Sequence, residues 1–134
     1  MKFHIDMTLP LNGEIFVFGS NEAGYHGGGA ARIAYKIYGA KCGMGTGLVG
    51  QTYAIPTKDS AINTLPLDVI KLNINKFIKF TLNNPDLSFF VTGVGTGLAG
   101  YSAEEIAPLF TGAINCSFPN NWKGYLGDSD ALSK

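Results

Sequence analysis

The 134-residue sequence is poor in charged residues and has no excess of either sign. Only 15% of the residues are charged, and ten basic residues balance ten acidic ones, so the formal net charge is zero. A protein that binds nucleic acid by neutralising phosphates usually has a basic excess or a basic stripe. The sequence therefore gives no strong nucleic-acid signal, whereas a nucleotide held by backbone N–H groups remains compatible with it.

Cysteine and histidine are also scarce, with two of each: Cys42, Cys116, His4 and His26. No C-x-x-C pair occurs and the two histidines are far apart, so we expect reduced thiols, no metal site and no cofactor. The first residues lack the apolar core of a signal peptide, and no apolar run approaches the roughly 18 residues of a membrane helix. These absences predict a cytoplasmic protein that does not enter a membrane.

Glycine and apolar residues are abundant instead. The sequence contains 18 glycines, and 46% of its residues are hydrophobic. This length and composition predict one domain, residues 1–134, with a core large enough to fold without disulfides. After about residue 122 the sequence becomes polar and glycine-rich, so we expect a flexible tail there.

Strand-like and helix-like patterns alternate along the chain. Strands are predicted at residues 2–7, 14–18, 52–55, 89–91 and 114–118, and helices at residues 30–38, 67–82 and 103–113. Pro56 is expected to end the third strand, and Pro108 to break the last helix. The alternation predicts an α/β fold, a three-layer α/β/α sandwich with a mixed, largely parallel sheet.

The segment most informative about function is residues 93–101, which read GVGTGLAGY. It follows a predicted strand, and residues 102–105 after it have the pattern of a capping box at the start of a helix. Glycines permit positive φ angles and leave backbone N–H groups uncovered, and a helix start adds further unpaired N–H groups. A strand, a glycine loop and a helix in this order predict a phosphate-binding loop.

The same string occurs twice in the chain. Residues 43–50 match residues 93–100 at every position but two. The first copy leads into a strand rather than a helix, so it is the weaker candidate for holding phosphate. Two interpretations stay open: a coincidence in a glycine-rich chain, or two similar loops that face one ligand.

A further glycine-rich region joins the strand at residues 14–18 to the helix at residues 30–38. Three predicted strands run into unusual sequences, at residues 19–21, 56–58 and 93–95. In parallel sheets, ligands bind beyond the carboxyl ends of the strands. If these strands are parallel, the three segments share one edge of the sheet.

Together these segments resemble the macrodomain pattern, in which an asparagine-bearing, glycine-rich loop enters a helix and a later strand leads to a Gly-Thr-Gly loop. The resemblance covers roughly residues 14–110, and the same segments are similar to those of a group of small bacterial and phage proteins. Macrodomains bind ADP-ribose, and some remove it from proteins, nucleic acids or small acetylated esters. The resemblance thus implies a macrodomain-like fold and a small-molecule nucleotide as the partner, ADP-ribose or a related nucleotide diphosphate.

The resemblance also implies roles for particular residues. Asn21 would lie beside the distal ribose, and Lys58 resembles a lysine that serves catalysis in one subgroup, which includes antitoxins that remove ADP-ribose from DNA. The chain lacks the His-Trp pair that follows this lysine there, and Asp6 is the candidate for holding the adenine. The implied ligand-binding residues are Ser20, Asn21, Gly27, Gly28, Gly29, Thr57, Gly95, Thr96, Gly97, Leu98, Ala99, Gly100 and Tyr101.

Three functions follow from these motifs. The first is binding of ADP-ribose with hydrolysis of ADP-ribosyl linkages, with Lys58 and Asn21 as catalytic residues. The second is a non-enzymatic module that binds a nucleotide signal. The third is a dinucleotide-dependent oxidoreductase, which requires an acidic residue about 20 positions beyond the loop, where Asn120 and Asn121 stand instead. The motifs do not indicate an oligomeric state.

Other residues near these motifs have simpler interpretations. Asn21 also suits a turn, because its side chain readily bonds the nearby backbone. Lys58 also suits a solvated strand end, and His26 is expected in an exposed loop. Tyr53, Tyr101 and Trp122 are expected to pack rather than to stack on a base.

Overall fold

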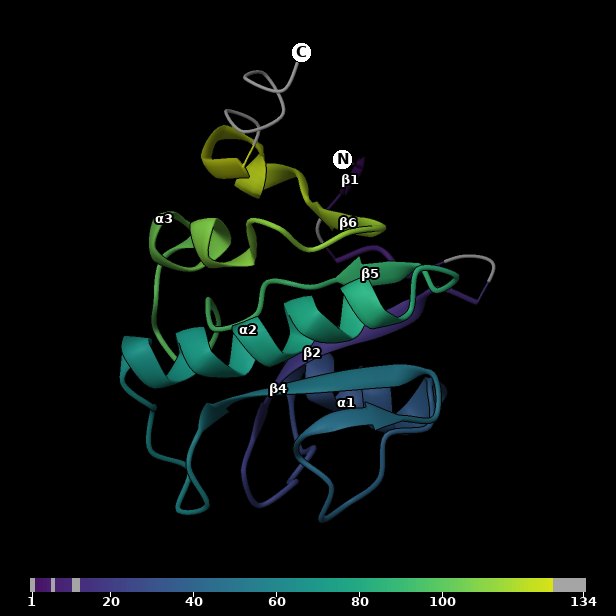
Figure 1. The fold of residues 1–134 in the computed structure, drawn as a ribbon. Helices are drawn as coiled ribbons and strands as arrows, with labels where there is room; N and C mark the ends of the chain where they lie inside the picture. Colours follow the sequence, from purple (N-terminus) through teal and green to yellow (C-terminus); the bar gives the residue numbers. More distant parts are fainter. Residues whose placement is uncertain (1, 6, 11–12, 127–134) are drawn as a thin grey trace.

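A computed structural model, which describes residues 2–5, 7–10 and 13–126, has an α/β fold built on a six-stranded sheet (Figure 1). The sheet order is β1-β6-β5-β2-β4-β3; neighbouring strands are parallel except for β3, which is antiparallel to β4. The strands are β1 (Lys2–His4), β2 (Ile15–Asn21), β3 (Gly47–Val49), β4 (Thr52–Lys58), β5 (Phe89–Val91) and β6 (Cys116–Pro119). The helices are α1 (Gly29–Ile37), α2 (Leu67–Asn83) and α3 (Ala103–Ile106), with 3₁₀ turns η1 (Ala107–Phe110) and η2 (Asn120–Trp122).

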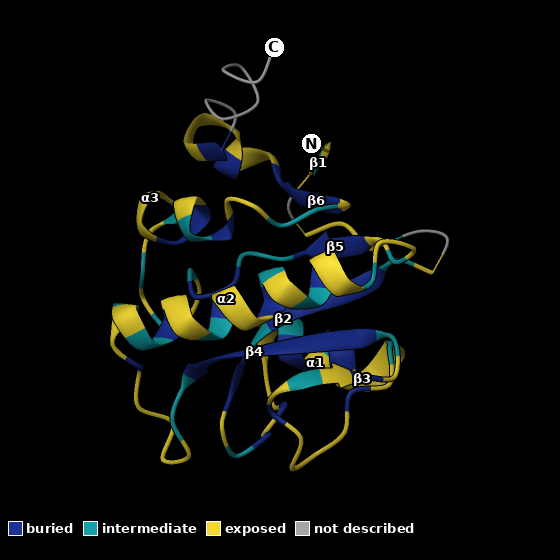
Figure 2. Ribbon diagram, viewed as in Figure 1, coloured by how far each residue is buried: buried dark blue, intermediate teal, exposed yellow. Residues whose placement is uncertain are grey.

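Helices cover both faces of the sheet. Along β2, Phe16 and Phe18 belong to a core cluster with α1, whereas Ile15 and Val17 belong to a cluster with α2 and α3. Successive side chains of a strand point to opposite faces, so an apolar run without alternation is buried on both sides. Figure 2 shows β2, β4 and β5 as buried along most of their length. The predicted α/β class with a mixed, largely parallel sheet is confirmed.

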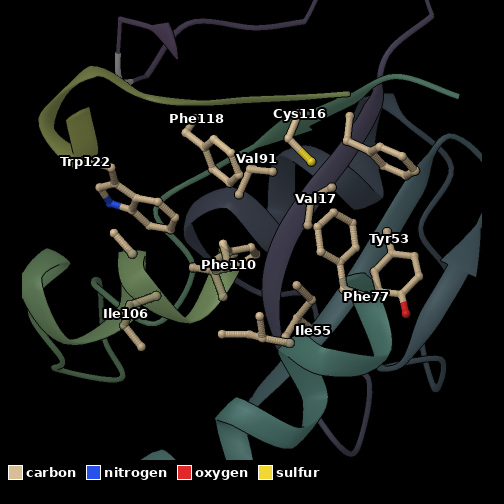
Figure 3. Close-up of a cluster of buried hydrophobic side chains, with 14 of the residues drawn as sticks. Val17, Tyr53, Ile55, Phe77, Val91, Ile106, Phe110, Cys116, Phe118 and Trp122 are labelled. Atoms are coloured by element: carbon tan, nitrogen blue, oxygen red, sulfur yellow. The ribbon is translucent and has the colours of Figure 1, made fainter. Parts of the chain in front are cut away.

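The long helix α2 supplies the centre of the larger core. Its buried residues Ile70, Ile74, Phe77 and Thr81 recur every three or four positions and therefore lie on one face. The Phe77 ring packs among aromatic rings from three other elements, as Figure 3 shows in part. The helix predicted at residues 67–82 is confirmed. None of the helices in the described ranges is long and apolar enough to cross a membrane.

Two central strands run further than predicted. β2 continues to Asn21, with an irregularity between Ser20 and Asn21, and β4 continues through Pro56 to Lys58. The expected stop at Pro56 is wrong because β3 pairs only with residues 52–54 of β4 among the described residues. Pro56 thus faces no strand on that side, and its missing N–H breaks no ladder. Both extensions carry the chain to the same edge of the sheet.

The elements near the two ends of the described chain differ in length from the predicted ones. The strand predicted at residues 2–7 is limited to β1, and Asp6, the candidate for holding adenine, lies outside the described residues. The tail expected to be flexible after residue 122 is helical over residues 123–126, and Leu126 is fully buried in the same cluster as Trp122. Burial of Leu126 explains why this part of the tail is ordered. Residues 127–134 lie outside the described residues.

Candidate functional site

The carboxyl ends of β5, β2 and β4 lie side by side, because these three strands are adjacent and parallel. Asn21 and Lys58 are register partners on β2 and β4. On the other side of β2, a Cβ on Gly19 would lie 3.3 Å from the Gly95 backbone nitrogen. The predicted shared edge is therefore confirmed, and it brings together segments that are up to 76 residues apart in the sequence, Gly19 and Gly95.

The loop after β5 exposes backbone N–H groups. Those of Gly97, Leu98 and Ala99 donate to no acceptor among the described residues. A Cβ on Gly97 would meet nothing within 4 Å, whereas Gly95 has φ +75° and a Cβ there would lie 2.9 Å from Ile106 Cδ1. Gly95 is thus required by the fold, whereas Gly97 has room for a side chain and lies beside free donors.

Two side-chain hydrogen bonds, one from Tyr101 and one from Thr96, fix the conformation of this loop. The Tyr101 hydroxyl donates to the Leu65 carbonyl at 2.7 Å, and the Thr96 hydroxyl donates to the Gly93 carbonyl at 2.7 Å. The capping box at the start of α3 is confirmed: the Glu105 N–H donates to Ser102 Oγ at 3.1 Å, and the Ser102 N–H donates to Glu105 Oε1 at 3.0 Å. Pro108 interrupts this helix as predicted, so α3 has a single turn before η1.

The loop after β2 ends in a second set of free donors. Helix α1 begins after Gly28, which provides no side-chain cap, and its first turn has no acidic residue. The first N–H groups of a helix have no partner within the helix. Gly27, Gly28 and Gly29 are exposed, and a Cβ on any of them would meet nothing within 4 Å. The start of α1 is therefore uncapped and uncovered.

Three polar side chains predicted to bind the ligand at this edge form hydrogen bonds with the protein backbone instead. The Asn21 carboxamide donates to the Tyr25 carbonyl at 2.8 Å and accepts from the Tyr25 N–H at 2.9 Å, the turn bonding that asparagine favours. The Ser20 hydroxyl donates to the Gly45 carbonyl, and the Thr57 hydroxyl donates to the Ser20 carbonyl at 3.3 Å. All three side chains are buried, so a ligand contact from them would have to share or replace these bonds.

The expectation that His26 is an exposed loop residue is wrong. Its side chain is only 6% exposed, Nε2 lies 2.9 Å from the Lys41 carbonyl, and the ring meets Phe18 edge to face. Nδ1 has no partner among the described residues. The glycines next to His26 in the sequence do not indicate burial. The residue is buried because residues 40–43 return beside this loop. His26 therefore anchors the loop through its contacts with Lys41 and Phe18.

The two copies of the repeated string have different conformations. Gly43 and Gly47 have φ near +84° and +82°, whereas their counterparts Gly93 and Gly97 do not adopt positive φ. Part of the first copy is the edge strand β3, and a Cβ on Gly45 would overlap the Asn21 carbonyl oxygen. The first copy thus supports the loop after β2 by close backbone packing, and the two copies are not equivalent loops.

Lys58 lies at the end of β4 with a fixed backbone. Its carbonyl accepts from the Glu22 N–H at 3.0 Å, and it forms a bridge with Thr64. Asp59 Oδ1 accepts from the N–H groups of Ala61 and Asn63, both at 2.9 Å. Within the described ranges Lys58 forms no ion pair, so the neighbouring carboxylate does not hold its amine.

The opposite edge of the sheet has a hollow of about 390 Å³ that shares no residue with these loops. Cys116 lies in its lining, and burial raises the pKa of this thiol to about 12. A thiol with this pKa stays protonated at neutral pH and is a poor nucleophile. Among the described residues, no three histidine, cysteine, aspartate or glutamate side chains form a group suited to a metal ion.

Comparisons of the chain with protein-family models, with curated proteins and with solved structures give no match. The macrodomain pattern therefore remains an expectation from the motifs, and the function must be inferred from the geometry of this edge.

Proposed function

We propose that this protein binds ADP-ribose or a related nucleotide diphosphate at the glycine-rich edge of its sheet. The observation that carries the proposal is the presence of two sets of uncommitted backbone donors beyond adjacent strands. One set is on Gly97–Ala99 after β5, and the other is the uncapped start of α1 after β2. Free N–H groups in glycine-rich loops and at helix starts bind phosphate oxygens well.

A diphosphate suits this arrangement better than a single phosphate, because two sets of donors can each serve one phosphoryl group. Lys58 adds a positive charge at the same edge and has no ion-pair partner in the described part of the chain. The resemblance of these loops to the macrodomain pattern further supports ADP-ribose. The free thiols of Cys42 and Cys116 agree with a cytoplasmic location, which is part of the proposal.

Gly97→Glu is expected to abolish binding without unfolding the protein. In the parent, ADP-ribose should raise the melting temperature as its concentration rises, because it binds only the folded state. Nothing lies within 4 Å of a Cβ at this position, so the fold accommodates a side chain. The glutamate would fill the space of the diphosphate and repel its charge. Calorimetry with ADP-ribose, NAD and AMP measures the loss.

Gly124→Glu is the matched control. A Cβ on Gly124 also meets nothing within 4 Å, and this residue lies beyond β6, away from both loops. The control should bind like the parent. A folded Gly97→Glu protein with parental affinity would contradict the proposed cradle, and tighter binding of NAD than of ADP-ribose would favour the oxidoreductase.

The pairing of Asn21 with Lys58 favours catalysis as a second candidate function. ADP-ribose is joined to its acceptor at the anomeric carbon of the distal ribose. A neutral lysine amine would bond to this carbon as the bond to the acceptor breaks, with the electron pair leaving on the acceptor together with the proton from the amine. The ribose ring of this adduct would then open, as the nitrogen lone pair forms a C=N bond and the ring oxygen leaves with the remaining proton of the amine. Water would hydrolyse the resulting Schiff base, which borohydride can reduce, and release ADP-ribose.

Lys58→Ala is expected to retain ADP-ribose binding and to lose release of ADP-ribose from a modified protein or DNA. Borohydride should trap a covalent adduct on the parent but not on the variant. Lys71→Ala, which changes an exposed lysine of α2, should behave like the parent. If the parent releases nothing from such substrates, the enzyme is excluded and the non-enzymatic binding module remains.

A further inference from the structure

Tyr25 is an exposed aromatic residue on a fixed backbone. Its side chain is 64% exposed. Both of its backbone polar groups are bonded to one carboxamide, that of Asn21, at 2.8 and 2.9 Å. Asn21 is itself buried at the end of β2. The exposed ring therefore extends from a backbone that a central strand holds in place.

The residues on either side of Tyr25 are also anchored. Gly24 packs so closely on the backbone of residues 43–44 that a Cβ would overlap it, and the Gly43 N–H donates to the Gly24 carbonyl at 3.1 Å. His26 is buried, with Nε2 2.9 Å from the Lys41 carbonyl. Only the middle residue of these three turns outward. Anchoring of this kind reduces the ordering cost of a contact with a ligand.

The position of Tyr25 relates it to the proposed cradle. It lies in the short loop between the end of β2 and the uncapped start of α1, two residues before Gly27. The segment against which Gly24 packs carries a second exposed apolar side chain, Met44, which is 47% exposed. The loop that leads to the donors at the start of α1 thus carries exposed aromatic surface, and a nucleotide combines phosphates with a flat aromatic base.

We propose that Tyr25 stacks on the base of the bound nucleotide. This inference rests on the proposed function and adds the group that recognises the base. Stacking between a base and an aromatic side chain tolerates any base, because each base has a π-face. The expectation that Tyr53, Tyr101 and Trp122 pack rather than stack on a base is confirmed: Tyr53 and Trp122 are buried, and Tyr101 packs on the core with its hydroxyl bonded to the Leu65 carbonyl.

The test compares ADP-ribose affinities of Tyr25→Ala, Tyr25→Leu and Tyr25→Phe with that of the parent by calorimetry. Loss of stacking should weaken binding about 10- to 100-fold in the alanine and leucine variants. The phenylalanine variant should keep parental affinity, because stacking needs the ring and not the hydroxyl. Tyr125→Ala, which removes an exposed aromatic ring beyond β6, should bind like the parent.

The other outcomes overturn the inference in distinguishable ways. Parental affinity in Tyr25→Ala, together with lost binding in Gly97→Glu, would retain the cradle and exclude Tyr25. Equal affinities of the leucine and phenylalanine variants would replace stacking by a general apolar contact. Weak binding by the phenylalanine variant would assign the effect to the hydroxyl. A parent that binds no ADP-ribose would overturn both this inference and the proposed function.

Discussion

Gly45→Ala should destabilise the protein by about 3 kcal/mol or more, a large part of the roughly 5–15 kcal/mol by which domains are usually stable. The new methyl group would overlap the Asn21 carbonyl oxygen and lie 3.2 Å from the Gly24 nitrogen. Both obstacles are backbone atoms, which cannot rotate away as a side chain can. Relief would require the loop after β2 to separate from the first copy of the repeat.

Gly97→Ala is the matched control for Gly45→Ala, because it adds the same methyl group to the other copy of the string. Neither glycine has a positive φ, and a Cβ on Gly97 meets nothing within 4 Å. Denaturant unfolding should show a change within about 0.5 kcal/mol for this variant. Similar stabilities of the two variants would show that the backbones do not pack as closely as described.

Phe77→Ala should cost about 3–5 kcal/mol of unfolding free energy. The ring is fully buried, and its centroid lies 5.0 Å from that of Tyr53, 5.3 Å from Phe89 and 5.9 Å from Phe110. These neighbours come from β4, β5 and η1. Because β4 and β5 are fixed in the sheet, the cavity would close only in part. The melting temperature should fall by more than about 10 °C.

Leu72→Ala provides the comparison on the same helix. Leu72 is 61% exposed, so its truncation should change stability by no more than about 0.5 kcal/mol. Thermal and denaturant unfolding of both variants measure the difference. A loss below about 1 kcal/mol for Phe77→Ala would mean that α2 does not supply the centre of the core.

The features that were predicted correctly depend on local patterns. The period of Ile70, Ile74 and Phe77 defines α2, and the apolar run of residues 15–18 indicates a strand buried on both faces. The shared edge follows from strand direction alone, since parallel strands end on the same side. These inferences required no knowledge of which distant side chains meet.

The features that were missed depend on contacts between distant segments. His26 is buried because residues 40–43 return beside it, and β4 passes through Pro56 because β3 stops short. The repeated string shows the limit most directly. Glycine adopts positive and negative φ with similar ease, so the surroundings decide between an edge strand in one copy and an open loop in the other.

The place of β1 in the sheet has a consequence for synthesis of the chain. Lys2 pairs with Ser117, and β6 is the neighbour of β1 in the described part of the sheet. Lys2 is made long before its partner Ser117, so β1 waits for β6 on the order of ten seconds at about 5–20 residues per second. By contrast, β2, β3 and β4 come from residues 15–58 and can pair much earlier. The half of the sheet that carries the loop after β2 is thus able to assemble first, and β1 joins the sheet only once translation has passed β6.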